Sequence, residues 1–146
     1  VKDLGELRDM YDAQTYLNRL TDEIRSEYAF EKFLGIEFDY RKRIEKKYPR
    51  LHYSISGVDF QISYFNSKTN PIILSIKPTV LVFLKPEKSA FIGPLLNEEQ
   101  VENAISNELN PIGRNMTIDL DKINFEKCIF FSDMKELKKT LEILNT

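Results

Sequence analysis

The sequence has a single cysteine, Cys128, and a single histidine, His52, among its 146 residues. One cysteine cannot form an intrachain disulfide or a paired-cysteine metal or redox motif. One imidazole excludes every site that needs two histidines, and the two counts together exclude structural zinc. Cys128 lies in the apolar run KCIFF, which predicts a buried, unreactive thiol in a reducing, cytoplasmic compartment.

Glycine is also scarce, with five residues spread far apart along the chain. No glycine-rich phosphate loop and no dinucleotide-binding fingerprint is present, so we expect no cofactor. A serine hydrolase would have to combine His52 with Ser54 or Ser56, and the GxSxG motif is missing. On one face of a strand these side chains would lie about 7 Å apart, which is too far for a direct hydrogen bond. The sequence therefore gives no support to nucleophilic catalysis.

Long hydrophobic runs are missing as well, because no segment approaches the roughly 18 apolar residues that a membrane-spanning helix requires. The longest apolar region, Pro71–Leu84, is interrupted by Ser75, Lys77, Pro78 and Thr79. Three acids in the first ten residues and the lack of an apolar core there do not fit a secretory signal. We expect a soluble protein with no membrane partner. The first residue is valine rather than methionine, which suggests a processed chain or a fragment of a longer one.

The composition, 42% hydrophobic and 30% charged, is that of a soluble domain large enough to bury a core. We interpret residues 1–146 as one α+β domain, with an N-terminal helical segment at 1–34 and a sheet-containing body at 36–146. Apolar residues at helical spacing support the first segment. They are Met10, Ala13, Leu17, Leu20 and Ile24. Gly35 fits the left-handed position that ends such a helix.

Alternation of apolar and polar residues predicts the strands. Two alternating runs, 51–56 and 58–64, meet at Ser56-Gly57 and predict a β-hairpin. Residues 72–84 keep one phase and predict either one long strand or two strands broken near Lys77-Pro78. Two further strands are predicted, one over residues 116–120 and one over residues 127–131.

Capping signals predict the remaining helices. Asn97 with Gln100 three residues later predicts a helix that runs to Leu109, and Asp133 with Glu136 predicts a final helix. A further helix is expected over residues 39–48. The order of elements predicts an α+β fold with a largely antiparallel sheet of about five strands, N-terminal helices, one inserted helix and a C-terminal helix.

The segment Tyr40–Tyr53 holds six of the 21 lysines and arginines and a single acid, Glu45, in a chain whose net charge is -2. A local reversal of charge sign attracts an acidic partner or a polyanion. The candidate binding residues are Arg41, Lys42, Arg43, Lys46, Lys47, Arg50 and His52. We refer to residues 41–50 as the basic segment. Nucleic acid is one possible ligand, although an isoelectric point near 5.6 is unusual for a nucleic-acid-binding domain.

A carboxylate pair offers a weaker, catalytic alternative. Asp119 and Asp121 are predicted to share one strand face beside Lys122, as in metal-dependent hydrolases and nucleases. The wet side of an edge strand explains the same pattern without a metal.

An apolar face points instead to association. If the even positions of residues 72–84 are core, Ile73, Leu81 and Phe83 lie on the other face and need a cover, from this chain or from a partner. We therefore predict a non-catalytic interaction domain of a larger protein or complex, with a protein partner or self-association. Nucleic-acid binding through the basic segment is the first alternative, and metal-dependent hydrolysis is the second.

Overall fold

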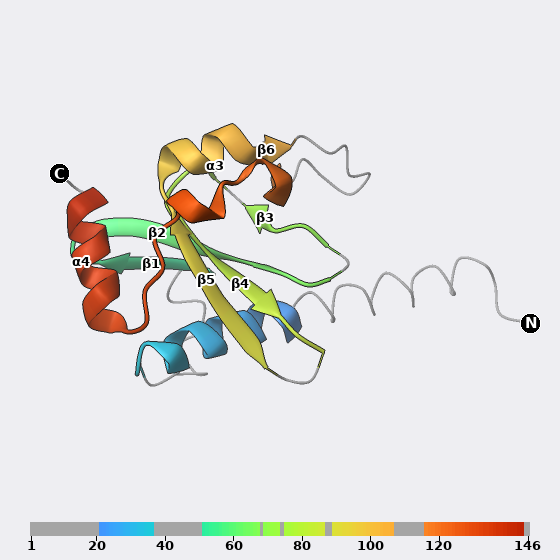
Figure 1. Ribbon diagram of the computed structural model, residues 1–146. Coiled ribbons are helices and arrows are strands. Elements are labelled where there is room, and N and C mark those ends of the chain that lie inside the picture. The colour runs from blue at the N-terminus through green and yellow to red at the C-terminus, as the bar shows by residue number, and fades with distance from the viewer. Residues whose placement is uncertain are drawn as a thin grey trace, which may run out of the picture.

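The computed structural model describes residues 21–36, 51–67, 69–73, 75–86, 89–106 and 116–144. In these ranges three α-helices and seven strands form an α+β fold, as predicted, with two sheets (Figure 1). The main sheet contains β1 (His52–Ile55), β2 (Val58–Phe65), β4 (Thr79–Leu84) and β5 (Ala90–Leu96), and the small sheet contains β3 (Ile72–Ile73), β6 (Ile105–Ser106) and β7 (Met116–Ile118). The three α-helices are one at residues 21–33, α3 (Glu98–Ala104) and α4 (Met134–Leu144). Two short 3-10 helices, η1 (Leu120–Lys122) and η2 (Phe125–Lys127), follow β7. The helices predicted before residue 21 and over residues 39–48 lie outside the described ranges.

The main sheet has the strand order β1-β2-β4-β5 and begins with the predicted hairpin. β1 and β2 pair antiparallel, with Ile55 opposite Val58. Ser56 and Gly57, which join them, have φ angles of 55° and 73°. Two successive residues with positive φ are what a type I′ turn requires, and that turn matches the twist of the flanking strands.

β2 and β4 pair in parallel, which is an exception to the largely antiparallel sheet predicted from the sequence. The chain between them leaves the main sheet and contributes β3, which pairs with β7 of the small sheet. The region 72–84 is therefore two strands in two different sheets rather than one continuous strand. The other four strand pairs are antiparallel, so the predicted antiparallel character holds for most of the structure.

The edge strand β5 was not expected from the sequence, because its centre contains Gly93 and Pro94. The register between β4 and β5 shifts between Val80 and Val82, which marks a bulge. A Cβ atom at Gly93 would lie 3.0 Å from the backbone oxygen of Leu81, so the two backbones approach closely at the bulge. Gly93 and Pro94, which disfavour a regular strand, thus both lie at the bulge between β4 and β5.

The main sheet is covered on both faces. On one face the helix at residues 21–33 and α4 bury an apolar cluster that includes Phe30, Phe60 and Leu141. On the other face α3 and the small sheet bury a second cluster around Leu81 and Val101. Figure 1 shows the sheet between the blue helix and the yellow-orange α3.

The second face answers the question of what covers the apolar side of residues 72–84. Ile73 and Leu81 are each 2% exposed and belong to the second cluster, so the chain itself covers them. Phe83 packs on Phe65 with the ring centroids 5.2 Å apart. Ile73 and Leu81 therefore do not belong to an interaction surface, whereas Phe83 stays partly exposed.

The capping signal at Asn97 is confirmed at the start of α3. Asn97 accepts a hydrogen bond from the backbone of Gln100, whose side chain accepts one from Asn97 in return. α3 nevertheless ends at Ala104 rather than Leu109, because Ile105 turns extended and joins the small sheet opposite β7. The pairing of Ile105 with β7 thus outweighs the helical spacing of the apolar residues, which predicted a longer helix.

The C-terminal region combines one confirmed helix with one missing strand. Asp133 caps α4 by accepting from the backbone N–H of Glu136, whose carboxylate accepts from the N–H of Ser132. The strand predicted over residues 127–131 is reduced to a single antiparallel bridge between Ile129 and Leu95. Cys128 is partly buried, and burial raises the pKa of its thiol, in line with an unreactive cysteine. Among the helices of the described ranges, none is both long and apolar enough to cross a membrane.

Candidate functional site

The structure describes one of the seven predicted binding residues. His52 opens β1 at an edge of the main sheet. The other six, which are Arg41, Lys42, Arg43, Lys46, Lys47 and Arg50, lie outside the described residues. What the structure shows for the basic segment is how the chain is held on either side of it.

The chain enters this region through a regular helix end. Gly35 adopts a φ of 76°, as its expected C′ position requires. The backbone N–H of Ile36 donates to the carbonyl of Glu31, and that of Gly35 donates to the carbonyl of Lys32. This pair of bonds is the Schellman motif, and it directs the chain out of the helix at residues 21–33.

The chain leaves the region at Leu51, which is held by the same helix. The N–H of Leu51 donates to Oε1 of Glu27 over 3.0 Å, and Glu27 is fully buried. Leu51 has a φ of 64°, a conformation that costs energy for a residue with a side chain and that persists where neighbouring contacts impose it. Glu27 and Glu31 are one helical turn apart, so both ends of the intervening chain meet one short stretch of helix.

Glu31 connects this stretch of helix to the main sheet. Its Oε2 accepts a hydrogen bond of 3.3 Å from the hydroxyl of Tyr53 in β1. Burial raises the pKa of the Glu31 carboxyl above its ordinary value, the Tyr53 bond opposes that rise, and the nearby Glu27 adds to it. The two acids therefore serve as internal anchors rather than as surface charges.

His52 lies in a polar patch on the other face of β1. Its Nδ1 is 2.7 Å from Nζ of Lys77, and since a lysine ammonium has no acceptor, the imidazole accepts and carries its own proton on Nε2. Partial burial lowers the pKa of His52 below its ordinary 6.5, Lys77 lowers it further, and Asp59 opposes the shift. His52 is therefore neutral at pH 7, and the cation at this position is Lys77.

The single histidine makes this assignment directly testable. We expect the one imidazole resonance in a ¹H NMR titration to report a pKa below 6.5. Lys77→Met should raise that pKa and Asp59→Asn should lower it, because each removes one of the two charges that act on the ring. The unfolded chain binds this proton more tightly, so the contribution of His52 to stability should fall as the pH drops below 6.5. A pKa that does not respond to Lys77→Met would contradict the contact.

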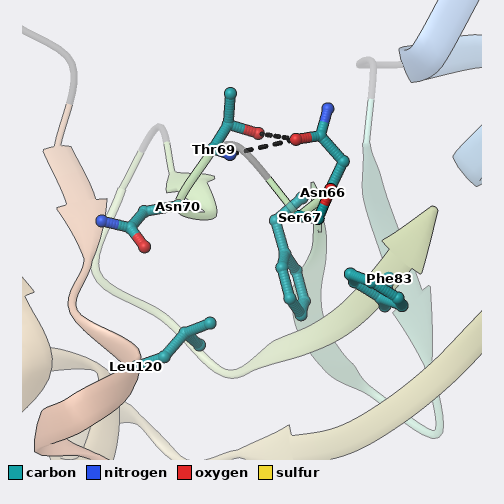
Figure 2. Close-up of a pocket in the computed structure, with 7 residues that line it drawn as sticks. Asn66, Ser67, Thr69, Asn70, Phe83 and Leu120 are labelled. Atoms are coloured by element: carbon teal, nitrogen blue, oxygen red, sulfur yellow. Dashed lines mark hydrogen bonds between the residues drawn. The ribbon is translucent and has the colours of Figure 1, made fainter. Parts of the chain in front are cut away.

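A separate pocket opens where the parallel strands β2 and β4 end. It has a volume of about 350 Å³, and Phe65 and Phe83 form part of its wall. Figure 2 shows Phe83 and Leu120 on two sides of the pocket, with Asn66 and Thr69 at the rim. Oδ1 of Asn66 accepts from both the N–H and the hydroxyl of Thr69, each over 3.0 Å. The described lining residues are apolar or neutral polar groups, which suit binding better than acid-base chemistry.

The proposed carboxylate pair does not share a strand face. Asp119 follows β7, and its Oδ1 accepts from the N–H of Asp121, which lies in the 3-10 turn η1. Asp119 therefore acts as a cap, and its geometry is set by the turn. Over the described part of the chain, no three acidic, histidine or cysteine side chains are grouped so that they could hold a metal ion.

The sequence did not reveal the anchoring role of Glu27 and Glu31. Two acids four residues apart on a helix usually face solvent. The available signal was their position beside Phe30 and Leu34, which bury the same side of the helix. Such a pattern becomes informative once a buried partner such as Leu51 is known.

Comparisons with known proteins do not place the chain in a family. No family model, no curated protein and no solved structure matches it.

Proposed function

We propose that the chain is a non-catalytic interaction domain whose basic segment docks against an acidic surface of another protein. The observation that carries the proposal is the fixation of the chain at both sides of that segment, by Ile36 on Glu31 and by Leu51 on Glu27. Fixed ends reduce the conformational freedom that the chain between them loses when it binds.

Charge supplies the second argument. The basic segment carries Arg41, Lys42, Arg43, Lys46, Lys47 and Arg50 within ten residues, against the single acid Glu45. Lys77 adds a cation beside His52, at the strand that follows the segment directly. A dense group of one sign in a chain of net charge -2 attracts acidic partners at that place.

The test uses charge reversal with a matched control. Lys46→Glu/Lys47→Glu/Arg50→Glu should reduce binding to fluorescent poly-L-glutamate by at least about tenfold at low salt, since several charge contacts are reversed. The control is Lys135→Glu/Lys138→Glu/Lys139→Glu, which changes the net charge equally on exposed positions of α4. Fluorescence anisotropy in rising salt measures both variants, and we expect the control to bind like the wild type.

Three results would overturn the proposal. Equal loss in the two variants would show that net charge acts, and not the basic segment. Absence of binding by the wild type at low salt would remove the acidic partner. Preference for a single-stranded oligonucleotide over poly-L-glutamate, with the steep salt dependence of phosphate contacts, would identify a nucleic-acid-binding domain instead.

A further inference from the structure

A groove lies between the helix at residues 21–33 and the first half of β5. It has a volume of about 430 Å³. The helix contributes Arg25, Tyr28, Lys32 and Phe33, and the strand contributes Ala90 and Ile92. Figure 1 shows the blue helix passing beside the start of β5. These residues are distinct from the basic segment.

The backbone of β5 offers hydrogen-bonding groups at this place. The N–H of Lys85 donates to the carbonyl of Ser89, so this pair of residues faces each other with hydrogen bonds. Hydrogen-bonded and non-hydrogen-bonded pairs alternate in an antiparallel ladder. Ala90 opposite Leu84 and Ile92 opposite Val82 are therefore non-hydrogen-bonded pairs. Their N–H and C=O groups point away from β4, toward the open edge of the sheet.

The same edge already accepts a strand-like partner further along. Beyond the bulge the N–H of Leu95 points outward and donates to the carbonyl of Ile129 over 2.9 Å. No comparable backbone bond from another described segment reaches Ala90 or Ile92. Within the described residues, the outward-facing backbone groups are therefore paired at the C-terminal end of β5 and unpaired at its N-terminal end, where a further strand could be added.

The helix side of the groove combines aromatic surface with positive charge. Tyr28 is 49% exposed and Phe33 is 39% exposed, so both aromatic rings present a large part of their surface to solvent. Nζ of Lys32 lies 5.9 Å from the centroid of the Tyr28 ring. Arg25 donates to the carbonyls of Lys85 and Ser89 and so holds the turn before β5 in place. The charged residues of the groove are both basic, so an acidic ligand is complementary to it.

We propose that this groove binds an extended acidic peptide of another protein, which pairs with β5 as an additional strand. Backbone bonds to Ala90 and Ile92 would supply affinity, and alternate side chains would face the helix. An acidic side chain near Lys32 and an apolar one against Phe33 fit this arrangement. A second copy of the chain fits less well, because pairing β5 with β5 would bring the basic residues of two grooves together.

The probe is a short synthetic peptide in which valine and glutamate alternate at every second position, with serine between them and a tryptophan at one end, so that one face of the strand presents both kinds of side chain. Since the chain contains no tryptophan, the fluorescence of the peptide can be excited selectively. We expect saturable binding to the wild type. A peptide with alternate backbone nitrogens methylated should bind about tenfold more weakly, because it cannot complete the ladder. This comparison leaves the protein unchanged, so folding of a variant does not enter it.

Protein variants then locate the site. Lys32→Glu should weaken binding about tenfold, whereas the control Lys138→Glu on α4 should have no effect. Lys46→Glu/Lys47→Glu/Arg50→Glu should keep the difference in affinity between the peptide and its methylated form, which separates this groove from the proposed function of the basic segment. Equal binding of the methylated peptide, or of a valine-lysine peptide, would overturn the proposal. So would sedimentation showing a dimer that the peptide disrupts, because β5 would then serve self-association.

Discussion

Replacing Phe30 by alanine should lower the free energy of unfolding by about 4 kcal/mol, the usual cost of removing a buried phenylalanine ring. Phe30 is fully buried and joins the helix at residues 21–33 to the main sheet. Its ring meets Tyr53 edge-on at 5.0 Å and Phe60 at 6.0 Å between centroids. Domains of this size are stable by about 5–15 kcal/mol, so this single change removes a large part of the total.

Urea unfolding followed by circular dichroism measures this effect. The matched control is Phe91→Ala, because Phe91 is 55% exposed in β5 and buries much less apolar area. We expect the control to cost less than about 1 kcal/mol, as most exposed substitutions do. A similar loss in both variants would contradict the central position of Phe30 in the core.

Replacing Glu27 by alanine should destabilise the fold by about 2 kcal/mol, because it leaves a buried backbone donor without its acceptor. The donor is the N–H of Leu51, whose positive φ the contact with Glu27 helps to hold. The loss should also release the chain on one side of the basic segment. Binding of poly-L-glutamate should therefore weaken, although no basic residue is changed.

Glu27→Gln separates the two properties of this side chain. It keeps the Oε1 acceptor for Leu51 and replaces the carboxyl group by a neutral amide of nearly the same shape. We expect it to retain most of the stability that Glu27→Ala loses, as measured by thermal unfolding at neutral pH. If the two variants were equally unstable, the carboxyl group of Glu27 would matter for more than its bond to Leu51. If neither differed from the wild type, the proposed anchor would be wrong.

Local signals in the sequence predicted the local parts of this fold. The capping pairs Asn97 with Gln100 and Asp133 with Glu136 mark helix starts through bonds between near neighbours. Ser56-Gly57 closes a hairpin because the turn and its two strands are contiguous. The final helix begins where Asp133 predicts, and it buries Leu137 and Leu141 completely.

The parts that depend on distant residues could not be predicted in this way. Ile105 continues the helical pattern of α3, yet it pairs with Ile118 in the small sheet. The residues Gly93 and Pro94 disfavour a strand, and the bulge that accommodates them depends on β4. Likewise, the alternation over residues 72–84 does not show that the first part of this region pairs in a second sheet before β4 begins.

The candidate site likewise has features that are visible in the sequence and features that depend on residues distant in the sequence. The concentration of charge in the basic segment is visible in the sequence, and its binding role stays a prediction. The pKa of His52 is lowered first by burial and then by Lys77, which is 25 residues away in the sequence. The groove at β5 joins residues 25–33 to residues 90–92, and neither part shows a ligand-binding pattern by itself.

The buried side chain of Gln61 has a consequence for how the two halves of the main sheet come together. Gln61 lies opposite Thr79 at the start of the parallel pair, and its amide donates to the hydroxyl of Thr79 and to the carbonyl of Ser75. A slip of β2 by one residue would turn this amide into the apolar cluster around Phe60 and remove both bonds. Gln61 thus fixes the register of β2 against β4. Apolar side chains alone could pack in a shifted register at a lower cost, whereas a buried amide without its hydrogen bonds could not.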